Sequence, residues 1–347
     1  MVKVHRSFEG QAVAGEGRVP TLAFLILPGF PLSCLTSAIE PLRAANEITG
    51  QRAFRWLVVG ETAAPVRASA DVGFEPDVAL DALPQIDALY VLASPDGTLE
   101  DPKHAYARLR RLDREGVTLG AFSGGIFPLA RAGLLEGHRC SVHWCYEAAF
   151  SAEFPQIEAC DAVITTDRRR HTASGANAVF ELMLRRIEAE IDAHTCTEVA
   201  CWFQHPLVRG EDVSQRRPTI RSASTDDMLP DAVARSIRLF EQNVEFPVQI
   251  AEAARTVGVS ARQLERCFKR ATGMSPLHYY RMLRLREARQ LVLYSNRALT
   301  DIAMAVGYCS STRMVRHYRE AFGASPREDR ERINLFRVRT NAPLPAQ

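Results

Sequence analysis

The sequence predicts an α/β domain followed by an all-α domain, and three observations support this expectation. Apolar stretches of strand length alternate with helical patterns through the first 205 residues. From residue 229 onward only helical patterns occur, and one segment is repeated with a period of about fifty residues. The 347 residues, 46% of them hydrophobic, suffice for two cores, since a domain takes roughly 100–200 residues.

The first domain is expected over residues 20–205, behind a flexible tail at 1–19. Its strands are apolar without strict alternation, which is typical of a parallel sheet covered on both faces. Residues 21–30 are expected to form a strand that ends in a Pro-Gly turn. The other expected elements are strands at 54–60, 86–93 and 117–123, helices at 35–50, 175–191 and 195–205, and a hairpin of 162–167 with 170–174. This alternation favours a flavodoxin-like sheet.

The second domain is expected over residues 229–333, between a linker at 206–228 and a tail at 334–347. The linker segment is polar, contains two prolines and lacks an apolar period. Residues 229–333 hold 18 Lys and Arg against 11 Asp and Glu, whereas the remainder holds 25 against 30. A basic module is therefore joined to an acidic one, as in many proteins that bind nucleic acid.

The sequence offers no pattern for a metal ion, a cofactor or a membrane span. Its eight cysteines are scattered, without a C-x-x-C pair or a Cys/His spacing that suits zinc. No stretch reaches the ~20 apolar residues of a membrane helix, and the N-terminus lacks the apolar block of a signal peptide. We expect a cytoplasmic protein with reduced thiols, and Cys145 leaves redox sensing as an alternative.

The repeated segment has the pattern of a helix-turn-helix motif in both copies. The stretch AARTVGVSARQLERCFKRATGMSP (253–276) recurs as IAMAVGYCSSTRMVRHYREAFGASP (302–326), with one extra residue in the second turn. Each copy has a short helix, a glycine turn, a serine at the N-cap position and a second, amphipathic helix. The matched pairs are Gly258 and Gly307, Leu264 and Met314, Arg266 and Arg316, Phe268 and Tyr318, Gly273 and Gly323, and Pro276 and Pro326.

In such a motif the early turns of the second helix enter the major groove of DNA. Arginine pairs with guanine and glutamine with adenine, so the polar side chains of these helices suit base reading. The residues expected to contact DNA are Ser260, Ala261, Arg262, Gln263, Arg266 and Lys269 in the first copy, and Ser311, Thr312, Arg313, Arg316 and Arg319 in the second. The alternative is a helical bundle with a solvated basic surface, which does not account for the matched turns and caps.

The segment between the two copies, residues 276–294, is expected to form one long helix. Its Leu277, Tyr280, Leu283 and Leu291 recur at helical spacing. A rigid support of this kind would place the two copies in successive major grooves, about 34 Å apart on one face of the DNA. The spacing between two half-sites would then be part of recognition.

At these residues the chain resembles the AraC/XylS family of bacterial transcription regulators. The resemblance covers residues 229–333 and includes the paired endings GMSP and GASP. It implies double-stranded promoter DNA as a partner and, usually, activation through direct repeats. We further expect a homodimer, with RNA polymerase as another partner.

A second motif lies in the first domain. A strand is expected to end in a sharp turn at Ser123, followed by a helix that opens with Gly124 and Gly125, as in a nucleophile elbow whose free amides bind an anion. His143 follows twenty residues later, and Glu40 lies upstream on the first helix. These residues can be brought together by the fold.

This set resembles the PfpI-like, class I glutamine-amidotransferase-like superfamily over roughly residues 21–200. There a cysteine at the elbow is accompanied by a histidine and an acid, so Ser123 stands in the place of the cysteine, His143 of the histidine and Glu40 of the acid. Serine needs an oriented base to react, and no obvious third group orients His143. We predict no catalytic residue and a binding-only domain. The alternatives are a DNA-tethered amidase or hydrolase that uses Ser123, and a constitutive structural DNA binder.

The whole arrangement resembles the GlxA-type subgroup of AraC regulators, on the segments PGFPLSCLTSAIEPLRAAN and GHRCSVHW. This resemblance implies control of a catabolic operon by a small nitrogen compound such as arginine, glycine betaine, dimethylglycine or carnitine. The expected ligand-binding residues are Phe30, Glu40, Ser123, Gly124, Gly125, His143 and Trp144.

Their proposed roles follow from the chemistry of such a ligand. The two glycine amides would hold a carboxylate, while Trp144, Phe30 or Phe122 would face a methylated ammonium; the alternative is that these aromatic rings fill the core. Ser174, Gly175 and Asn177 begin a further helix, where they line the same site, form a dimer contact or act only as a cap.

Overall fold

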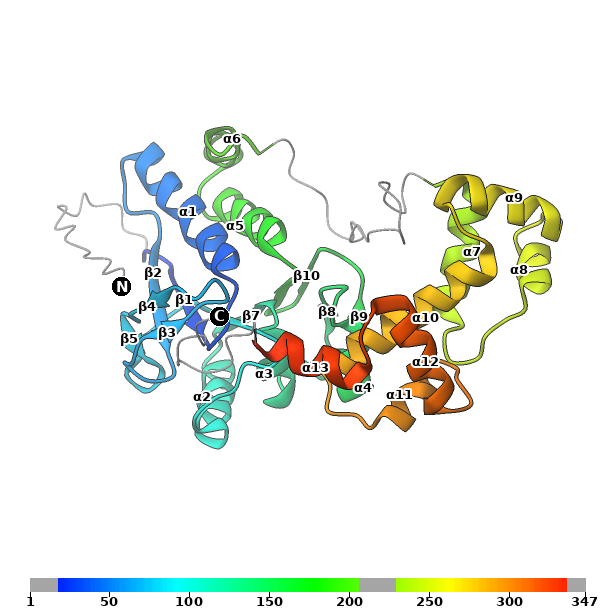
Figure 1. Cartoon of the computed structure of the whole chain (residues 1–347). Helices are drawn as coiled ribbons and strands as arrows, with labels where there is room; N and C mark the ends of the chain where they lie inside the picture. The colour runs from blue at the N-terminus through cyan, green and yellow to red at the C-terminus, as the bar shows by residue number, and fades with distance from the viewer. Residues whose placement is uncertain (1–17, 206–228, 336–347) are drawn as a thin grey trace. The chain divides into compact units, whose positions relative to one another are not determined.

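The computed structural model describes residues 18–205 and 229–335, which belong to two separate units. The first unit is an α/β domain and the second is all helical, so the predicted fold classes are confirmed (Figure 1). The predicted linker at 206–228 lies outside the described residues, as does most of each predicted tail.

The first unit is built on a seven-stranded sheet in the order β10-β11-β7-β6-β1-β2-β5. All neighbouring strands are parallel except β10 and β11, which form the predicted hairpin at one edge. The order β2-β1-β6-β7-β11 is that of a flavodoxin-like sheet. The strands are β1 (Thr21–Ile26), β2 (Arg55–Gly60), β3 (Val66–Arg67), β4 (Gly73–Phe74), β5 (Val78–Ala79), β6 (Ala88–Ala93), β7 (Thr118–Ser123), β8 (Arg139–Ser141), β9 (Glu158–Cys160), β10 (Ile164–Asp167) and β11 (Arg170–Ala173).

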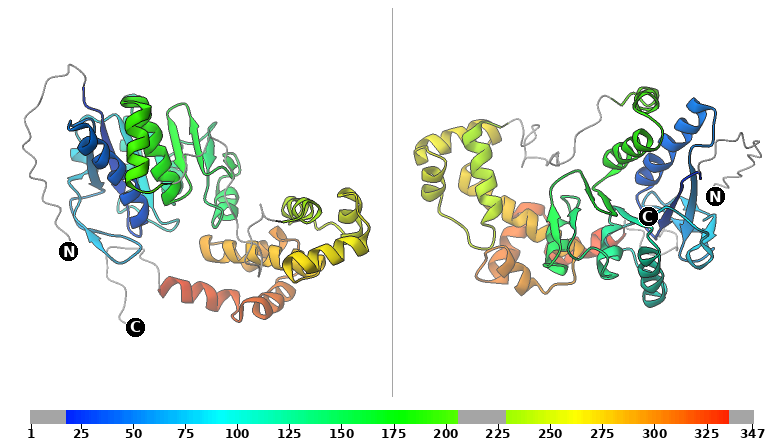
Figure 2. Two further views of the ribbon diagram at one scale, coloured as in Figure 1. Left: turned by 90° about the horizontal axis from the view of Figure 1, so that it is seen from above. Right: turned by 180° about the vertical axis from the view of Figure 1, so that it is seen from behind.

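Helices cover both faces of this sheet, as the apolar strands predict. One group packs together on one face, and α2 and α3 pack on the other, with α3 against β6 and β7 (Figures 1 and 2). The covering helices are α1 (Leu32–Thr49), α5 (Ala176–Glu190) and α6 (Ala193–Trp202) in the first group, and α2 (Pro102–Arg114) and α3 (Ile126–Arg131) in the second; the unit also contains α4 (Glu147–Glu153) and the 3-10 turn η1 (Leu80–Ala82).

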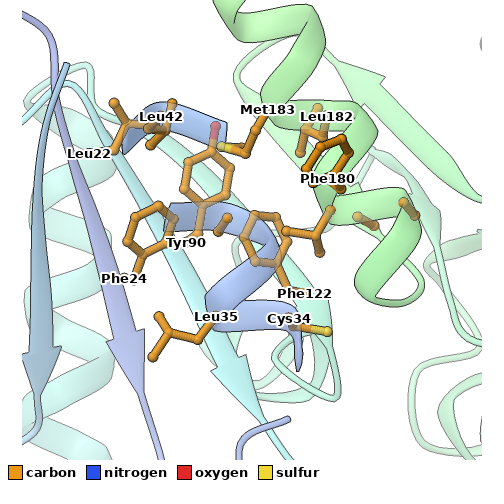
Figure 3. Close-up of a cluster of buried hydrophobic side chains, with 14 of the residues drawn as sticks. Leu22, Phe24, Cys34, Leu35, Leu42, Tyr90, Phe122, Phe180, Leu182 and Met183 are labelled. Carbon is orange, nitrogen blue, oxygen red and sulfur yellow. The ribbon is translucent and has the colours of Figure 1, made fainter. Parts of the chain in front are cut away.

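The core of the first unit is a stack of aromatic rings on the sheet beneath α1 and α5 (Figure 3). Tyr90 on β6 stacks on Phe24 of β1 at 5.8 Å between ring centroids and on Phe122 of β7 at 4.7 Å. All three rings are fully buried. The Tyr90 hydroxyl lies 3.3 Å from Nδ1 of His171, and burial lowers the pKa of this histidine to about 4.

The first strand ends in the predicted Pro-Gly turn. Its last residue is Ile26, and the turn follows with Gly29 at φ 74°. Phe30, after the turn, pairs with Ala68 in an isolated bridge. This turn brings the start of α1 to the carboxyl end of the sheet.

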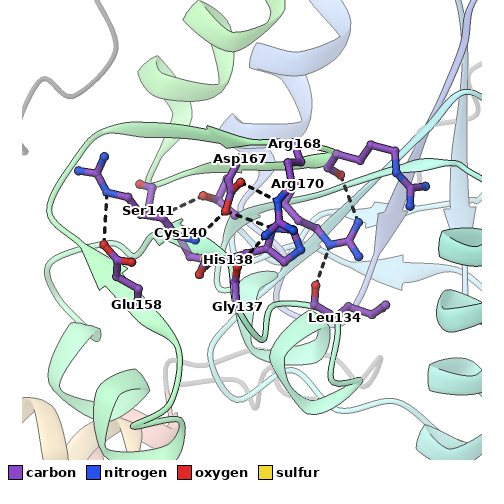
Figure 4. A network of polar contacts seen from close by, with 12 residues as sticks. Leu134, Gly137, His138, Cys140, Ser141, Glu158, Asp167, Arg168 and Arg170 are labelled. Carbon is purple, nitrogen blue, oxygen red and sulfur yellow. Dashed lines mark hydrogen bonds and ion pairs between the residues drawn. The ribbon is translucent and has the colours of Figure 1, made fainter.

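A polar network ties the β10–β11 hairpin to the segment that carries His143 (Figure 4). Asp167 at the end of β10 accepts a hydrogen bond from the backbone of Arg139 on β8 at 3.0 Å. Hydrogen bonds from Arg168 and from this amide hold the pKa of Asp167 near 2. Arg170 is buried and donates to the Leu134 carbonyl at 2.7 Å. The strand β8, which leads directly to His143, is therefore held against the edge of the sheet.

The second unit contains the two predicted helix-turn-helix motifs, which we call head 1 and head 2. Head 1 is α8 and α9, head 2 is α11 and α12, and α10 runs between them (Figure 1). The helices are α7 (Asp231–Gln242), α8 (Ile250–Thr256), α9 (Ala261–Thr272), α10 (Pro276–Tyr294), α11 (Leu299–Ala305), α12 (Ser311–Phe322) and α13 (Pro326–Leu335).

The predicted helix at 276–294 is confirmed at both ends, but its predicted apolar face is partly wrong. Leu277 is 57% exposed and Leu283 is half-buried, whereas Tyr280 and Leu291 are buried as expected. Because this helix lies between two heads, it buries more than one face, and a single stripe does not describe it.

The two heads share their outline and differ in what holds them. In head 1, Phe268 of α9 lies in an aromatic cluster with Phe240, whose ring stacks on Tyr280 at 4.2 Å between centroids. In head 2 the matching residue is Tyr318, whose hydroxyl donates to the buried carboxylate of Asp329 on α13 at 2.8 Å. Head 2 is therefore fastened by a charged group where head 1 is apolar.

Candidate functional site

The predicted elbow lies at the carboxyl end of β7. Ser123 has φ 53°, in the left-handed region that favours glycine, so its backbone is strained. The following glycines lie close to β6: a Cβ on Gly124 would lie 2.5 Å from the Ala93 carbonyl oxygen, and one on Gly125 only 1.9 Å from that of Val91. The elbow is thus fixed by close backbone packing.

Ser123 does not bond to His143, as a catalytic pair would require. Its Oγ lies 2.7 Å from the hydroxyl of Tyr146, a buried residue that precedes α4. The Tyr146 ring stacks on His143 at 5.4 Å between centroids, and Trp144 lies 5.6 Å from His143. We call Ser123, His143, Trp144 and Tyr146 the elbow site.

His143 is held in a form that suits donation rather than base catalysis. Its Nδ1 accepts a hydrogen bond from the backbone of Cys145 at 3.2 Å. Burial lowers the pKa of His143, which favours the neutral ring at pH 7. In a neutral imidazole whose Nδ1 accepts, Nε2 carries the proton and is a donor.

Three of the expected ligand residues lie in other surroundings. Glu40 is paired with Arg43 on the same helix at 2.9 Å, with 44% of its side chain exposed. The amide of Gly125 donates to the Phe122 carbonyl at 3.0 Å, so it is not free to hold an anion. Phe30 is fully buried and packs edge-on against Phe74, which supports the core alternative for its ring.

Phe122 is also in the core, stacked on Tyr90. Gly175, at the start of α5, lies next to the elbow site, because a Cβ there would be 3.7 Å from the His143 ring. Tyr146 was not predicted, although it lies three residues after His143 in the segment CSVHWCYEAAF. Within residues 18–205 and 229–335 there is no group of three or more His, Cys, Asp and Glu side chains placed to hold a metal ion.

Head 1 presents a polar helix face to solvent. Ser260 caps α9 by accepting from the Gln263 amide, and Leu264 and Phe268 are buried. The side chains of Ala261, Arg262, Arg266 and Lys269 are exposed. Gln263 closes a capping box, in which its side-chain Oε1 accepts a hydrogen bond from the Ser260 backbone at 2.9 Å. This hydrogen bond must break before the Gln263 side chain can bind adenine through both its oxygen and its nitrogen.

Head 2 repeats this arrangement. Ser310 caps α12, Met314 and Tyr318 are buried, and Ser311 is half-buried. Thr312, Arg313, Arg316 and Arg319 are exposed, with Arg319 4.0 Å from Glu328.

His317 is a further polar residue of α12 that was not predicted. Its Nδ1 lies 3.2 Å from the Tyr308 hydroxyl. Burial, and then the charge of Arg281 on α10, lower the pKa of His317. Arg281 therefore lies close enough to head 2 to add to its positive charge.

None of the helices that the structure describes is long and apolar enough to cross a membrane.

Comparisons with known proteins match both halves of the chain. The family described as the DJ-1/PfpI family matches residues 23–189, and the family described as Helix-turn-helix domain matches residues 253–332.

Curated relatives match nearly the whole length. The chain is 34% identical to the HTH-type transcriptional regulator GbdR of Pseudomonas aeruginosa over 96% of this chain and 90% of that protein. It is 34% identical to the HTH-type transcriptional regulator CdhR of P. aeruginosa, over 90% and 92% of the two chains. It is 28% identical to the HTH-type transcriptional regulator GlxA of Rhizobium meliloti, over 92% and 99%.

Proposed function

The chain belongs to the AraC-type transcriptional regulators that carry a DJ-1/PfpI domain, and we propose that it activates a catabolic operon when a small nitrogen compound binds at the elbow site. The single observation that carries the proposal is the pair of matched heads, each capped by serine and each exposing arginines on one helix face. We also propose that the protein acts in the cytoplasm, because its DNA partner lies there.

The DNA contacts are proposed on the exposed faces of α9 and α12. Arg266 and Arg316 are equivalent in the two heads and reach solvent from the middle of each helix. We expect the full chain to bind promoter fragments upstream of neighbouring catabolic genes, with an affinity that falls steeply with salt because phosphate contacts release counterions.

The test is fluorescence anisotropy with the wild type, Arg266→Ala and Arg316→Ala over a salt series. Each variant should lose about 1–3 kcal/mol of binding free energy if it reads a base, or about one unit of salt slope if it contacts phosphate. Arg238→Ala, on the exposed face of α7, is the matched control. Salt-insensitive binding without preference for promoter DNA would contradict the proposal.

Ligand sensing is proposed at the elbow site because of its hydrogen-bonding groups. The Ser123 and Tyr146 hydroxyls and Nε2 of His143 suit a carboxylate, and the Trp144 ring suits a methylated ammonium. We therefore expect an effector that carries both groups, such as an amino acid, a betaine or carnitine.

The sensing proposal is tested by a thermal-shift screen of the full chain against amino acids, betaines and polyamines, because a specific ligand raises stability by mass action. A hit should lose its shift in Trp144→Leu and keep it in Trp202→Leu, whose side chain is exposed on α6. A shift that survives Trp144→Leu would place the ligand elsewhere.

A binding-only role is proposed over hydrolysis because the Ser123 hydroxyl is bonded to a phenol. Turnover of simple amides should be undetectable in the wild type and unchanged in Ser123→Ala. Activity abolished by that substitution would favour the tethered hydrolase instead. A homodimer is also proposed, and sedimentation with and without DNA measures it directly.

A further inference from the structure

Head 2 is held by an arginine that reaches it from the helix between the heads. Arg284, near the middle of α10, donates from Nε to the Val306 carbonyl at 2.7 Å and from Nη2 to the Gly307 carbonyl at 2.5 Å. Its guanidinium also lies over the Tyr308 ring, 4.6 Å from the centroid. These three residues form the turn between α11 and α12, so one side chain fixes the turn that aims the reading helix.

One turn earlier in α10, Tyr280 holds the loop that leads from α7 into head 1. The Tyr280 hydroxyl donates to the Asn243 carbonyl and accepts from the Val248 amide at 3.3 Å. Asn243 and Val248 bound the loop between α7 and α8, which we call the α7–α8 loop (residues 243–249). A single phenol therefore secures both ends of this loop.

The α7–α8 loop rests directly on the turn of head 2. A Cβ on Gly307 would lie 2.6 Å from the Val244 carbonyl oxygen and 2.8 Å from that of Glu245, closer than real Cβ atoms approach. Gly258, its equivalent in head 1, has nothing within 4 Å of the same position. Both glycines have positive φ, at 69° and 78°. Only at Gly307 does the backbone of the α7–α8 loop also leave no room for a Cβ atom.

We propose that Arg284, Tyr280 and the α7–α8 loop form a clamp that sets the angle between α9 and α12, and thereby the spacing of half-sites that the regulator accepts. A long helix alone fixes the distance between its ends, and Asp329 already ties α12 to α10 through Tyr318 and Arg289. The clamp adds the orientation of the head 2 turn, because it binds that turn to α10 and to the α7–α8 loop at once. Arg284 and Tyr280 are thus positioning residues rather than DNA contacts.

The proposal rests on the proposed function, in which α9 and α12 enter successive major grooves. B-DNA completes a turn in about 10–10.5 base pairs, so one inserted base pair rotates the second half-site by ~35° and moves it by ~3.4 Å. A rigid pair of heads cannot follow this rotation, whereas a loosened pair can. Spacing tolerance therefore measures the clamp separately from affinity.

The experiment uses the full chain and a set of duplexes selected for wild-type binding. The gap between the two half-sites is changed by −1, 0, +1 and +2 base pairs, and dissociation constants are measured by anisotropy. The wild type should lose at least tenfold in affinity for any change of one base pair. Arg284→Met, which keeps the apolar stem, should lose less than threefold across the same step. Its salt dependence should equal that of the wild type.

Tyr280→Phe provides a second variant in case Arg284→Met does not fold. It removes both hydrogen bonds to the α7–α8 loop, keeps the ring that stacks on Phe240, and should flatten the spacing profile in the same direction. Arg238→Met, on the exposed face of α7, is the matched control and should keep the wild-type profile.

The outcomes separate the two proposals. A sharp profile retained by a folded Arg284→Met or Tyr280→Phe would overturn the clamp while leaving DNA recognition intact. A flat profile in the wild type would also overturn the clamp. If the selection yields no duplex that the wild type binds specifically, the proposed function is overturned, and the clamp with it.

Discussion

The buried carboxylate of Asp329 makes head 2 sensitive to a single change, Asp329→Asn. Asp329 is 4% exposed and accepts from the Tyr318 hydroxyl at 2.8 Å and from Arg289 at 2.6 and 3.0 Å. It joins α10, α12 and α13. Asparagine keeps the shape and one acceptor oxygen, but it removes the charge that these donors face.

The expected cost follows from burial and access to water. Removing one partner of a buried ion pair costs about 3–5 kcal/mol when the other charge is left uncompensated. Arg289 retains 40% exposure of its side chain, so water reaches its guanidinium and the lower end applies. We expect Asp329→Asn to lower the free energy of unfolding of the second unit by about 3 kcal/mol. Asp231→Asn, an exposed carboxylate 3.7 Å from Arg235, should cost below about 0.5 kcal/mol.

The assay uses the placement of the three tryptophans. Trp56, Trp144 and Trp202 all lie in the first unit, so their fluorescence follows only that unit during urea unfolding, while far-UV ellipticity follows both. Asp329→Asn should move the helical transition by at least about 1 M urea and leave the fluorescence transition in place. A cost below about 1 kcal/mol would refute the reasoning, because it would mean that Asp329 is effectively hydrated in the folded state.

Three further predictions concern backbone strain, close packing and a half-buried histidine. Gly307→Ala should destabilise the second unit by more than about 2 kcal/mol and Gly258→Ala by only about 1 kcal/mol. Both glycines have positive φ, but only a Cβ at position 307 would clash with backbone atoms. Equal effects of the two substitutions on unfolding followed by ellipticity would contradict this. Ser123→Gly should be more stable than Ser123→Ala by about 0.5–1 kcal/mol by tryptophan fluorescence, because both lose one hydrogen bond and only glycine relieves φ 53°. The pKa of His171 is lowered to about 4, so the unfolded state takes up a proton between pH 6.5 and 4 while the folded state does not. Stability is therefore complete above about pH 6.5 and lost as the pH falls, and His171→Gln should remove roughly 2–3 kcal/mol of that loss; parallel pH profiles for the two proteins would count against it.

The sequence predicted most of the fold because its main elements are long and periodic. The central strands β1 and β6 are almost entirely apolar, and the two heads repeat the same turn, cap and core positions. The strand pairs β3–β4 and β8–β9 were not predicted, because strands of two or three residues are too short to show a period. Leu277 was misplaced because α10 is packed on more than one side.

The elbow site was predicted less well than the fold. The turn at Ser123 has a local signature, so its residue and its glycines were found. Which groups meet Ser123 depends on tertiary packing, which decides that Tyr146 rather than His143 faces its hydroxyl. Glu40 was placed by its position on the first helix, but its side chain is directed to Arg43. The clamp involves contacts between residues more than twenty positions apart, which no local pattern encodes.

The hydroxyl at the elbow separates the chemistry of this position from the redox state around it. A thiol in this position passes through sulfenic, sulfinic and sulfonic acids as oxidants accumulate, and each form changes its charge and size. Ser123 has no such series, and its strained turn keeps one chemical composition whatever the redox state around it. The elbow side chain itself should therefore stay unchanged by peroxide at levels that convert an exposed elbow cysteine, and Cys145 is the neighbouring thiol through which such an oxidant could still act on the elbow site.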